Sequence, residues 1–542
     1  MSQHADSIIR DAVIFTADRE RLWAEAMAVA DGRILHIGDL ESVLRFAGED
    51  TDVRSLEGRF LMPGIIDGHN HPALAGRTAL FELSVSPAAS YEEALETIRE
   101  YAAGLAPGAW ITGAGWGLHL LEVISTAEAL AGLDEATAGH PMVLVDISRH
   151  NRWANTAAMM AAGVVPGEGV LVDERGVPTG VLFERAGLPV AYAAAREGGL
   201  TDEQERTAYR HSIGILHSYG ITSFQDAAVT PELLAALHGL DAAGELDAWV
   251  VSSMMMNDEV LGAEIIGEPL LDLAEQYRSE HHRPDFVKLF LDGIPPARTA
   301  AMLEPYLEDA QHGCGYCGST ILSADELYQT LTVTSRRGLG AKIHSTGDAA
   351  TRLILDTVQR LREEGHAFRC QIAHGQYVAP DDVPRFAELD VDADISPYIW
   401  YPGPLPEAIK MAVPEERAVR IHPNRDLIAA GALVSAGSDW PVSPVPNPWQ
   451  ALAGLVTRRD PTGEFPGALW PEQSLTVREA IEVFTINGAR MLGIDDVTGS
   501  LEAGKSADFV VLDTNLFEVD PNEIGGAAPQ ETWFAGRRVF SR

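Results

Sequence analysis

The central part of the chain alternates short apolar runs with segments of helical periodicity. After one such run, residues 348–362 repeat apolar side chains at close to 3.6-residue spacing. This alternation is typical of parallel β/α units, and eight units predict an α/β fold closed into a distorted (β/α)8 barrel. The eight predicted strands are Phe60–His71, Gly220–Asp226, Ala248–Met256, Asp285–Asp292, Gly340–His344, Arg369–His374, Val391–Ser396 and Ala432–Asp439.

Short strand-like segments lie at both ends of the chain. Residues 26–38 predict a hairpin with an Asp31-Gly32 turn, and residues 507–513 have the same strand-like character. A β cluster of this size is too small to bury its own apolar face. We therefore expect one composite β-sandwich, built from residues 1–58 and 497–542.

The sandwich encloses a predicted barrel domain at residues 59–496. Between its first two strands, residues 73–219 are far too many for a loop. We expect an inserted subdomain there, with a strand of its own at residues 141–147.

Charge and cysteine content limit the partners of the chain. Lys+Arg 40 against Asp+Glu 79 gives a net charge of −39, which disfavours nucleic acid and anionic membranes as partners. No apolar run approaches 18 residues, and no secretory signal opens the sequence. With 3 cysteines there is no disulfide framework, so Cys314-x-x-Cys317 is interpreted as a reduced loop and the expected location is the cytoplasm.

Histidines, one lysine and one aspartate close the predicted strands. His69 and His71 lie at i and i+2 on a strand, so their imidazoles face the same side. The carboxyl ends of barrel strands meet at one mouth, where such side chains converge. Imidazole and carboxylate together suit zinc and its first-row neighbours. The other strand-closing residues are Lys288, His344, His374 and Asp439.

These motifs identify a resemblance over nearly the whole chain. The sequence resembles the metal-dependent amidohydrolase superfamily, a TIM-barrel family, within the subfamily that includes N-substituted formamide deformylases (amidohydrolase family 3). The motifs are Pro63-Gly64-Ile65-Ile66-Asp67-Gly68-His69-Asn70-His71, His150 followed by Asn155, Gly220-Ile221-Thr222-Ser223, Val287-Lys288-Leu289-Phe290-Leu291-Asp292-Gly293, His344-Ser345-Thr346-Gly347-Asp348, Ala373-His374-Gly375-Gln376, Gly437-Ser438-Asp439-Trp440-Pro441, and the closing Gly499–Asp508 segment.

The resemblance implies a site for two divalent metal ions, with zinc expected first. His69, His71 and Asp439 would hold one metal, and His344 and His374 the second. Lys288 would bridge them after carboxylation by CO₂, since an ammonium cannot ligate a cation whereas an anionic carbamate can. The alternative is a mononuclear site in which Lys288 pairs with Asp292.

The implied activity is hydrolysis of an amide-type C–N bond other than a peptide bond. The substrate would be a small molecule, an N-substituted formamide or another N-acyl compound, attacked by metal-activated water. Asp439 would act as base and then acid. Alternatives are a cyclic amidohydrolase of the dihydropyrimidinase or hydantoinase kind, a deaminase, or a non-enzymatic scaffold that retained the fold. A homodimer is expected from the frequency of twofold symmetry.

Five further residues are candidates for substrate binding. His150 and Asn155 would reach the substrate from the insert, and three tryptophans would form an aromatic wall. The alternative for each is an ordinary core or surface position. Glu184 matches a family position whose role the sequence does not reveal. The tryptophans are Trp116, Trp400 and Trp440.

Overall fold

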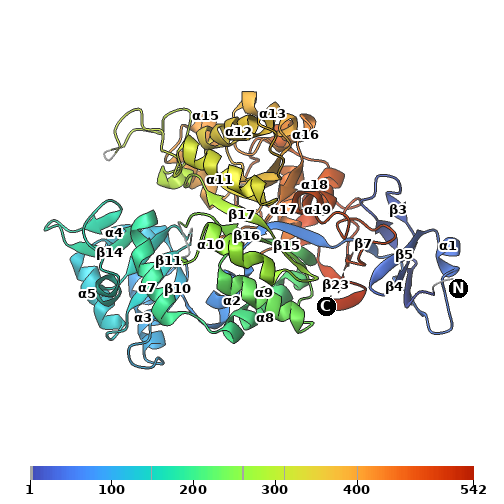
Figure 1. Cartoon of the computed structure of the whole chain (residues 1–542), viewed down its shortest axis with the longest axis horizontal. Helices are drawn as coiled ribbons and strands as arrows, with labels where there is room; N and C mark the ends of the chain where they lie inside the picture. The colour runs from blue at the N-terminus through green and yellow to red at the C-terminus, as the bar shows by residue number, and fades with distance from the viewer. Residues whose placement is uncertain (1–3, 148, 259–261, 310–311, 400) are drawn as a thin grey trace.

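Three bodies lie in a row along the molecule (Figure 1). The computed structural model describes residues 4–542 except 148, 259–261, 310–311 and 400. A barrel occupies the centre, an α/β insert lies at one end and a β-sandwich lies at the other.

The barrel has eight parallel strands in chain order, which confirms the predicted fold class. Helices cover its outer face. Among them, α12 (Asp348–Glu363) buries the predicted apolar stripe, including Ile354 and Leu361. The strands are β8 (Ile65–Asn70), β15 (Ile221–Val229), β16 (Trp249–Met255), β17 (His282–Phe290), β18 (Gly340–Ser345), β19 (Cys370–His374), β20 (Val391–Ile395) and β21 (Val434–Ala436).

The sandwich combines strands from both ends of the chain. One sheet has the order β5-β4-β1-β6, and the other the order β24-β23-β22-β7-β2-β3. Asp31 and Gly32 join β4 to β5 with φ values of 50° and 74°, the left-handed pair of a type I′ turn. The bounds are β1 (Ser7–Arg10), β2 (Val13–Phe15), β3 (Trp23–Ala24), β4 (Ala26–Ala30), β5 (Arg33–Gly38), β6 (Asp52–Ser55), β7 (Phe60–Pro63), β22 (Phe509–Leu512), β23 (Pro529–Phe534) and β24 (Arg537–Ser541).

The single strand expected at residues 60–71 is wrong, because the structure divides it. Phe60–Pro63 pairs with β2 and β22 in the sandwich, whereas Ile65–Asn70 pairs with β15 in the barrel. Gly64 lies between the two strands, and a Cβ there would come within 2.1 Å of the Thr222 hydroxyl. The change of sheet therefore occurs at a position too crowded for a side chain.

The insert has its own six-stranded sheet, in the order β13-β14-β12-β11-β10-β9. Its core includes the buried rings of Trp116 and Trp153. Strand β11 lies where a strand was expected from the sequence. The strands are β9 (Leu83–Ser84), β10 (Ile111–Trp116), β11 (Met142–Asp146), β12 (Asn151–Ala154), β13 (Val170–Val172) and β14 (Pro178–Phe183), and the main helices are α3 (Tyr91–Ala102), α5 (Ala127–Ala136), α6 (Thr156–Ala161) and α7 (Leu188–Gly198).

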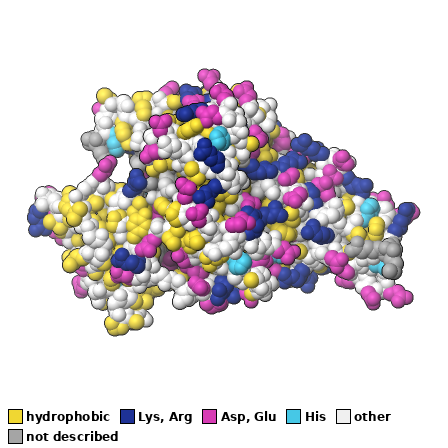
Figure 2. Space-filling view, in the orientation of Figure 1, with side chains coloured by type: hydrophobic (Ala, Val, Ile, Leu, Met, Phe, Trp, Pro, Cys, Tyr) yellow, Lys and Arg dark blue, Asp and Glu magenta, His cyan; other side chains and the backbone are white. Residues whose placement is uncertain are grey.

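Acidic and basic side chains are interspersed over the face of the molecule drawn in Figure 2. Hydrophobic side chains are more frequent over the insert, where Met160 and Val165 are 77% and 69% exposed. Within the described residues, no helix has both the length and the apolar character needed to cross a bilayer.

Hydrogen bonds join the first and last barrel strands. The Asp67 carboxylate accepts from the Ser438 amide at 2.8 Å and the Ser438 hydroxyl at 2.6 Å. The Asp439 amide donates to the His69 carbonyl at 2.7 Å. The segments approach so closely that a Cβ on Gly437 would lie 2.3 Å from the His69 backbone nitrogen. Only glycine fits there without moving one of the two strands.

We expect Gly437→Ala to lower the free energy of unfolding by about 3 kcal/mol, because the methyl group overpacks against backbone. The matched control is Gly214→Ala, on the exposed face of α8 (Asp202–Ser218), where no atom lies within 4 Å of the added Cβ. That change should stabilise the helix by up to about 1 kcal/mol. Urea unfolding of both variants tests the expectation, which fails if Gly437→Ala unfolds like the wild type.

Candidate metal centre

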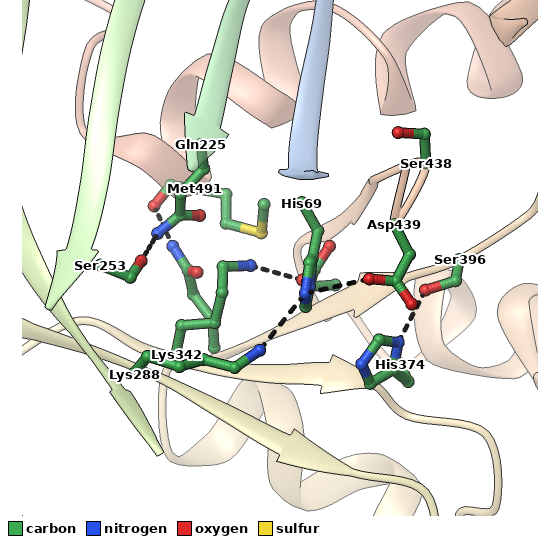
Figure 3. A network of polar contacts seen from close by, with 12 residues as sticks. His69, Gln225, Ser253, Lys288, Lys342, His374, Ser396, Ser438, Asp439 and Met491 are labelled. Atoms are coloured by element: carbon green, nitrogen blue, oxygen red, sulfur yellow. Dashed lines mark hydrogen bonds and ion pairs between the residues drawn. The ribbon is translucent and has the colours of Figure 1, made fainter. Parts of the chain in front are cut away.

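Two histidines and an aspartate converge at the junction of the first and last strands. The Asp439 Oδ1 atom lies 3.7 Å from His69 Nε2 (Figure 3). The same oxygen lies 3.4 Å from His71 Nε2. The donor atoms of the three residues all lie within 4.8 Å of one another. One cation could therefore contact all three donors at once.

A buried carboxylate orients the His69 ring. Asp394, on β20, accepts from His69 Nδ1 at 2.9 Å and from Lys342 Nζ at 2.5 Å. With Nδ1 as donor, the His69 Nε2 lone pair faces Asp439 and is available to a cation. We did not single out Asp394 or Lys342 from the sequence, although a charged residue inside an apolar strand is a usable signal.

His344 and His374 lie side by side next to this group. Their ring centroids are 4.6 Å apart, and the His374 ring is 4.8 Å from that of His69. His374 Nδ1 bonds Ser396 Oγ at 2.9 Å, and His344 Nε2 donates to the Gly293 carbonyl at 3.1 Å. Each ring thus has one nitrogen bonded to the protein, and both residues line the cavity.

Lys288 lies at the centre of the cluster and is 1% exposed. Its Nζ atom is 3.3 Å from His69 Nε2. Burial, together with the charge of Lys342, lowers the pKa of Lys288 to about 7, so the neutral amine is readily available. The Asp292 carboxylate instead accepts amide hydrogens from Ala301, Thr346 and Gly347, at 3.0, 3.0 and 2.9 Å. Among the described residues, the alternative pairing of Lys288 with Asp292 is not observed.

The histidines of the cluster are held in the form that binds metal. Burial lowers the pKa of His69, His344 and His374 well below the usual value for histidine, and the nearby lysine charge adds to the effect. Burial also lowers the pKa of His71. The buried Nδ1 atom of His71 has no hydrogen-bond partner among the described residues. Neutral imidazoles beside a carboxylate match the donor preference of zinc and related ions. The residues present therefore fit a divalent metal.

These side chains line a cavity of about 140 Å³ at the mouth of the barrel. The rest of the cavity wall includes several apolar side chains. The apolar lining residues are Leu74, Phe290, Ile294, Ile399, Leu405 and Val442.

Comparison with known proteins establishes the family. The model of the amidohydrolase family matches residues 52–540. The chain belongs to this family. It is 28% identical to N-substituted formamide deformylase from Arthrobacter pascens over 100% of this chain and 99% of that protein. It is 27% identical to Protein LONG AFTER FAR-RED 3 from Arabidopsis thaliana over 99% and 92% of the respective chains.

A solved structure shares the fold of this amidohydrolase. An uncharacterized metal-dependent hydrolase from Pyrococcus horikoshii superimposes with a TM-score of 0.75, at 24% identity, over 95% of this chain and 99% of that one. The resemblance and the fold predicted from the sequence are thus confirmed.

His150 reaches the cavity from the insert. It directly precedes β12, and Glu184 directly follows β14. These two strands are antiparallel neighbours with Asn151 opposite Phe183, so His150 and Glu184 face each other. His150 Nδ1 lies 3.0 Å from Glu184 Oε2. Burial alone would lower the pKa of His150, because it disfavours the charged ring. The hydrogen bond to Glu184 and the charge of that carboxylate have the larger effect, so the pKa of His150 is raised. Glu184 thus favours the protonated form of an imidazole that lines the cavity.

Among the described residues, Asn155, Trp116 and Trp440 do not line the cavity. Asn155 caps α6 by accepting from the Ala158 amide at 3.0 Å, and its amide group donates to Thr137 and His140, both at 2.8 Å. An asparagine just before a helix is a typical N-cap, which is the signal that we missed. The structure corrects the aromatic wall as well: Trp116 lies in the insert core and Trp440 in the barrel core, and Trp400 falls outside the described residues.

We expect Asp394→Asn to weaken zinc binding by about 10–100-fold, because it removes the acceptor that orients His69 and leaves Lys342 without its counter-charge. The control is Asp392→Asn on the same strand. Burial raises the pKa of Asp392 to about 8, so its carboxyl is already neutral near pH 7 and the amide mimics it. Competition with a chromophoric chelator measures both affinities. Equal zinc affinity in Asp394→Asn and wild type would contradict the assigned role.

Proposed function

We propose that this amidohydrolase hydrolyses the amide-type C–N bond of a small N-substituted formamide or another N-acyl compound. The observation that carries the proposal is the convergence of six potential ligand residues on one cavity with an apolar wall. Similarity to N-substituted formamide deformylase along the full length supports the same reaction class.

Two divalent metal ions, zinc in the first instance, complete the proposed site. His69, His71 and Asp439 would hold one ion, and His344 and His374 the other. Lys288, carboxylated on Nζ, would lie between them, where its carbamate offers two anionic oxygens in place of an ammonium beside His69 Nε2. When bound, the ions supply the Lewis acidity that activates water and polarises a carbonyl.

Asp439 is the proposed carrier of the proton. Asp439 lines the cavity, and its Oδ1 atom lies close to the Nε2 atoms of His69 and His71. It would accept the proton of the attacking water and deliver it to the departing nitrogen, as base and then acid. The apolar side chains that line the cavity would limit the entry of other water molecules, and they would also contact the substituent on the amide.

Elemental analysis of wild type and Lys288→Ala tests the metal site. We expect about two metal ions per wild-type chain and a lower content in the variant, because the bridging group is lost. Lys410→Ala is the matched control, since this lysine lies on the surface beside Glu407. It should retain the wild-type metal content and activity.

Other metal contents would favour a different kind of site or contradict the proposed one. One metal in both wild type and Lys288→Ala would favour a mononuclear hydrolase or deaminase, and no metal in either would contradict the proposal. Turnover of formamides, N-acyl amino acids and cyclic imides by the metal-loaded protein then separates the linear from the cyclic amidohydrolase activity.

His150 is proposed to donate a hydrogen bond to the substrate carbonyl. His150→Ala should lower kcat/KM by about 100-fold, with metal content unchanged. His150→Gln restores a donor and should recover part of the loss. Steady-state kinetics on the best formamide substrate provide the measurement. A loss of metal in both variants would instead indicate that His150 supports the metal site.

A further inference from the structure

A second, larger cavity adjoins the first. It has a volume of about 340 Å³ and lies between the insert and the barrel. Leu74 and Arg149 line both cavities, so the two are neighbours separated by these side chains. A substrate bound at the metal centre could therefore extend past Arg149.

Arg149 has no carboxylate partner within ion-pair distance among the described residues. Its hydrogen bond runs from Nη2 to Thr78 Oγ1, at a long 3.4 Å. Arg77, which lines the same second cavity, instead donates to both oxygens of Glu205, at 2.8 and 2.6 Å. Both arginines are half-buried, and a guanidinium that is partly shielded from water normally has such a bidentate acceptor. Arg149 therefore has donors available for a ligand.

The backbone of Arg149 adopts a conformation that is uncommon for a residue with a side chain. Its φ is +65°, in the left-handed region that glycine adopts freely and other residues adopt at a cost of about 1 kcal/mol. Residues in this region persist where the surrounding structure holds them, and they are frequent at active sites and in turns. Here the strain places a guanidinium at the boundary of the two cavities.

The surroundings of Arg149 favour an anion over a neutral group. Burial lowers the pKa of Arg149, which reflects the cost of holding the charge in a poorly hydrated place. Glu82, Asp146 and Asp439 reduce that cost only from a distance. With a net charge of −39, the protein has no long-range attraction for anions, so a local cation is required to hold one.

We propose that Arg149 binds a carboxylate on the substrate, so that the enzyme acts on amides that carry an acid group, such as N-acyl amino acids. This inference rests on the proposed function for the position of the amide. The carboxylate would form a bidentate pair with the guanidinium, while the apolar side chain of the substrate contacts the Phe290 and Leu405 wall.

Equilibrium binding tests the inference without requiring turnover. The probes are the ketone analogue of N-acetylphenylalanine, in which a methylene replaces the amide nitrogen, and its neutral carboxamide. We expect the metal-loaded wild type to bind the acid at least about tenfold more tightly than the carboxamide. Arg149→Gly should abolish this preference, and its folding should not suffer, because glycine relieves the strained φ. Arg149→Lys should retain part of the preference.

Arg175→Ala controls for net charge. This arginine lies on the insert surface with its side chain 77% exposed, and its removal should leave the preference unchanged. Equal affinity of wild type for acid and carboxamide would overturn the inference, as would an unchanged preference in Arg149→Gly. Preference for the acid without hydrolysis of any amide would contradict the proposed function alone. Hydrolysis of neutral formamides without an acid preference would contradict only the role of Arg149.

Discussion

The hydrogen bonds between Asp67 and Ser438 hold the first and last barrel strands together, and the metal centre depends on that contact. His69 lies near the end of β8 and His71 directly follows this strand, whereas Asp439 follows β21. The Asp439 amide bonds the His69 carbonyl, and the His71 amide bonds the Trp440 carbonyl at 2.8 Å. Closing the barrel and bringing the three donors together are thus a single structural event.

Burial of the residues at the mouth of the barrel determines the protonation of the histidines and of Lys288. Burying charge is costly unless each group finds a partner, and removal of one partner is strongly destabilising. Asp394 meets this requirement for Lys342 and orients His69 at the same time. The same burial keeps the imidazoles neutral and brings the pKa of Lys288 close to neutrality. Burying so many ionisable groups lowers the stability of the folded protein, and clusters of this kind are typical of functional sites.

Periodicity and strand-end chemistry predicted most of the barrel, because both are local properties of the sequence. His69, Lys288, His344 and Asp439 could be placed at one mouth since parallel strands end on the same side. The change of sheet at Gly64 could not be predicted, because it depends on a close approach by Thr222, far along the chain. Trp116 and Trp440 were misplaced for a related reason. A large aromatic side chain fits a core and a pocket equally well, and only tertiary packing distinguishes the two.

The composite sandwich has a consequence for how the protein is made. Strand β7 pairs with β2 early in the sequence, but its other edge is covered only by β22, which is synthesised after the entire barrel. Until then the nascent chain carries an open sheet edge, with unpaired amides ready to bind another strand. We expect this edge to need protection while the barrel is being translated, and a chain that ends before residue 509 to aggregate more readily than the full chain.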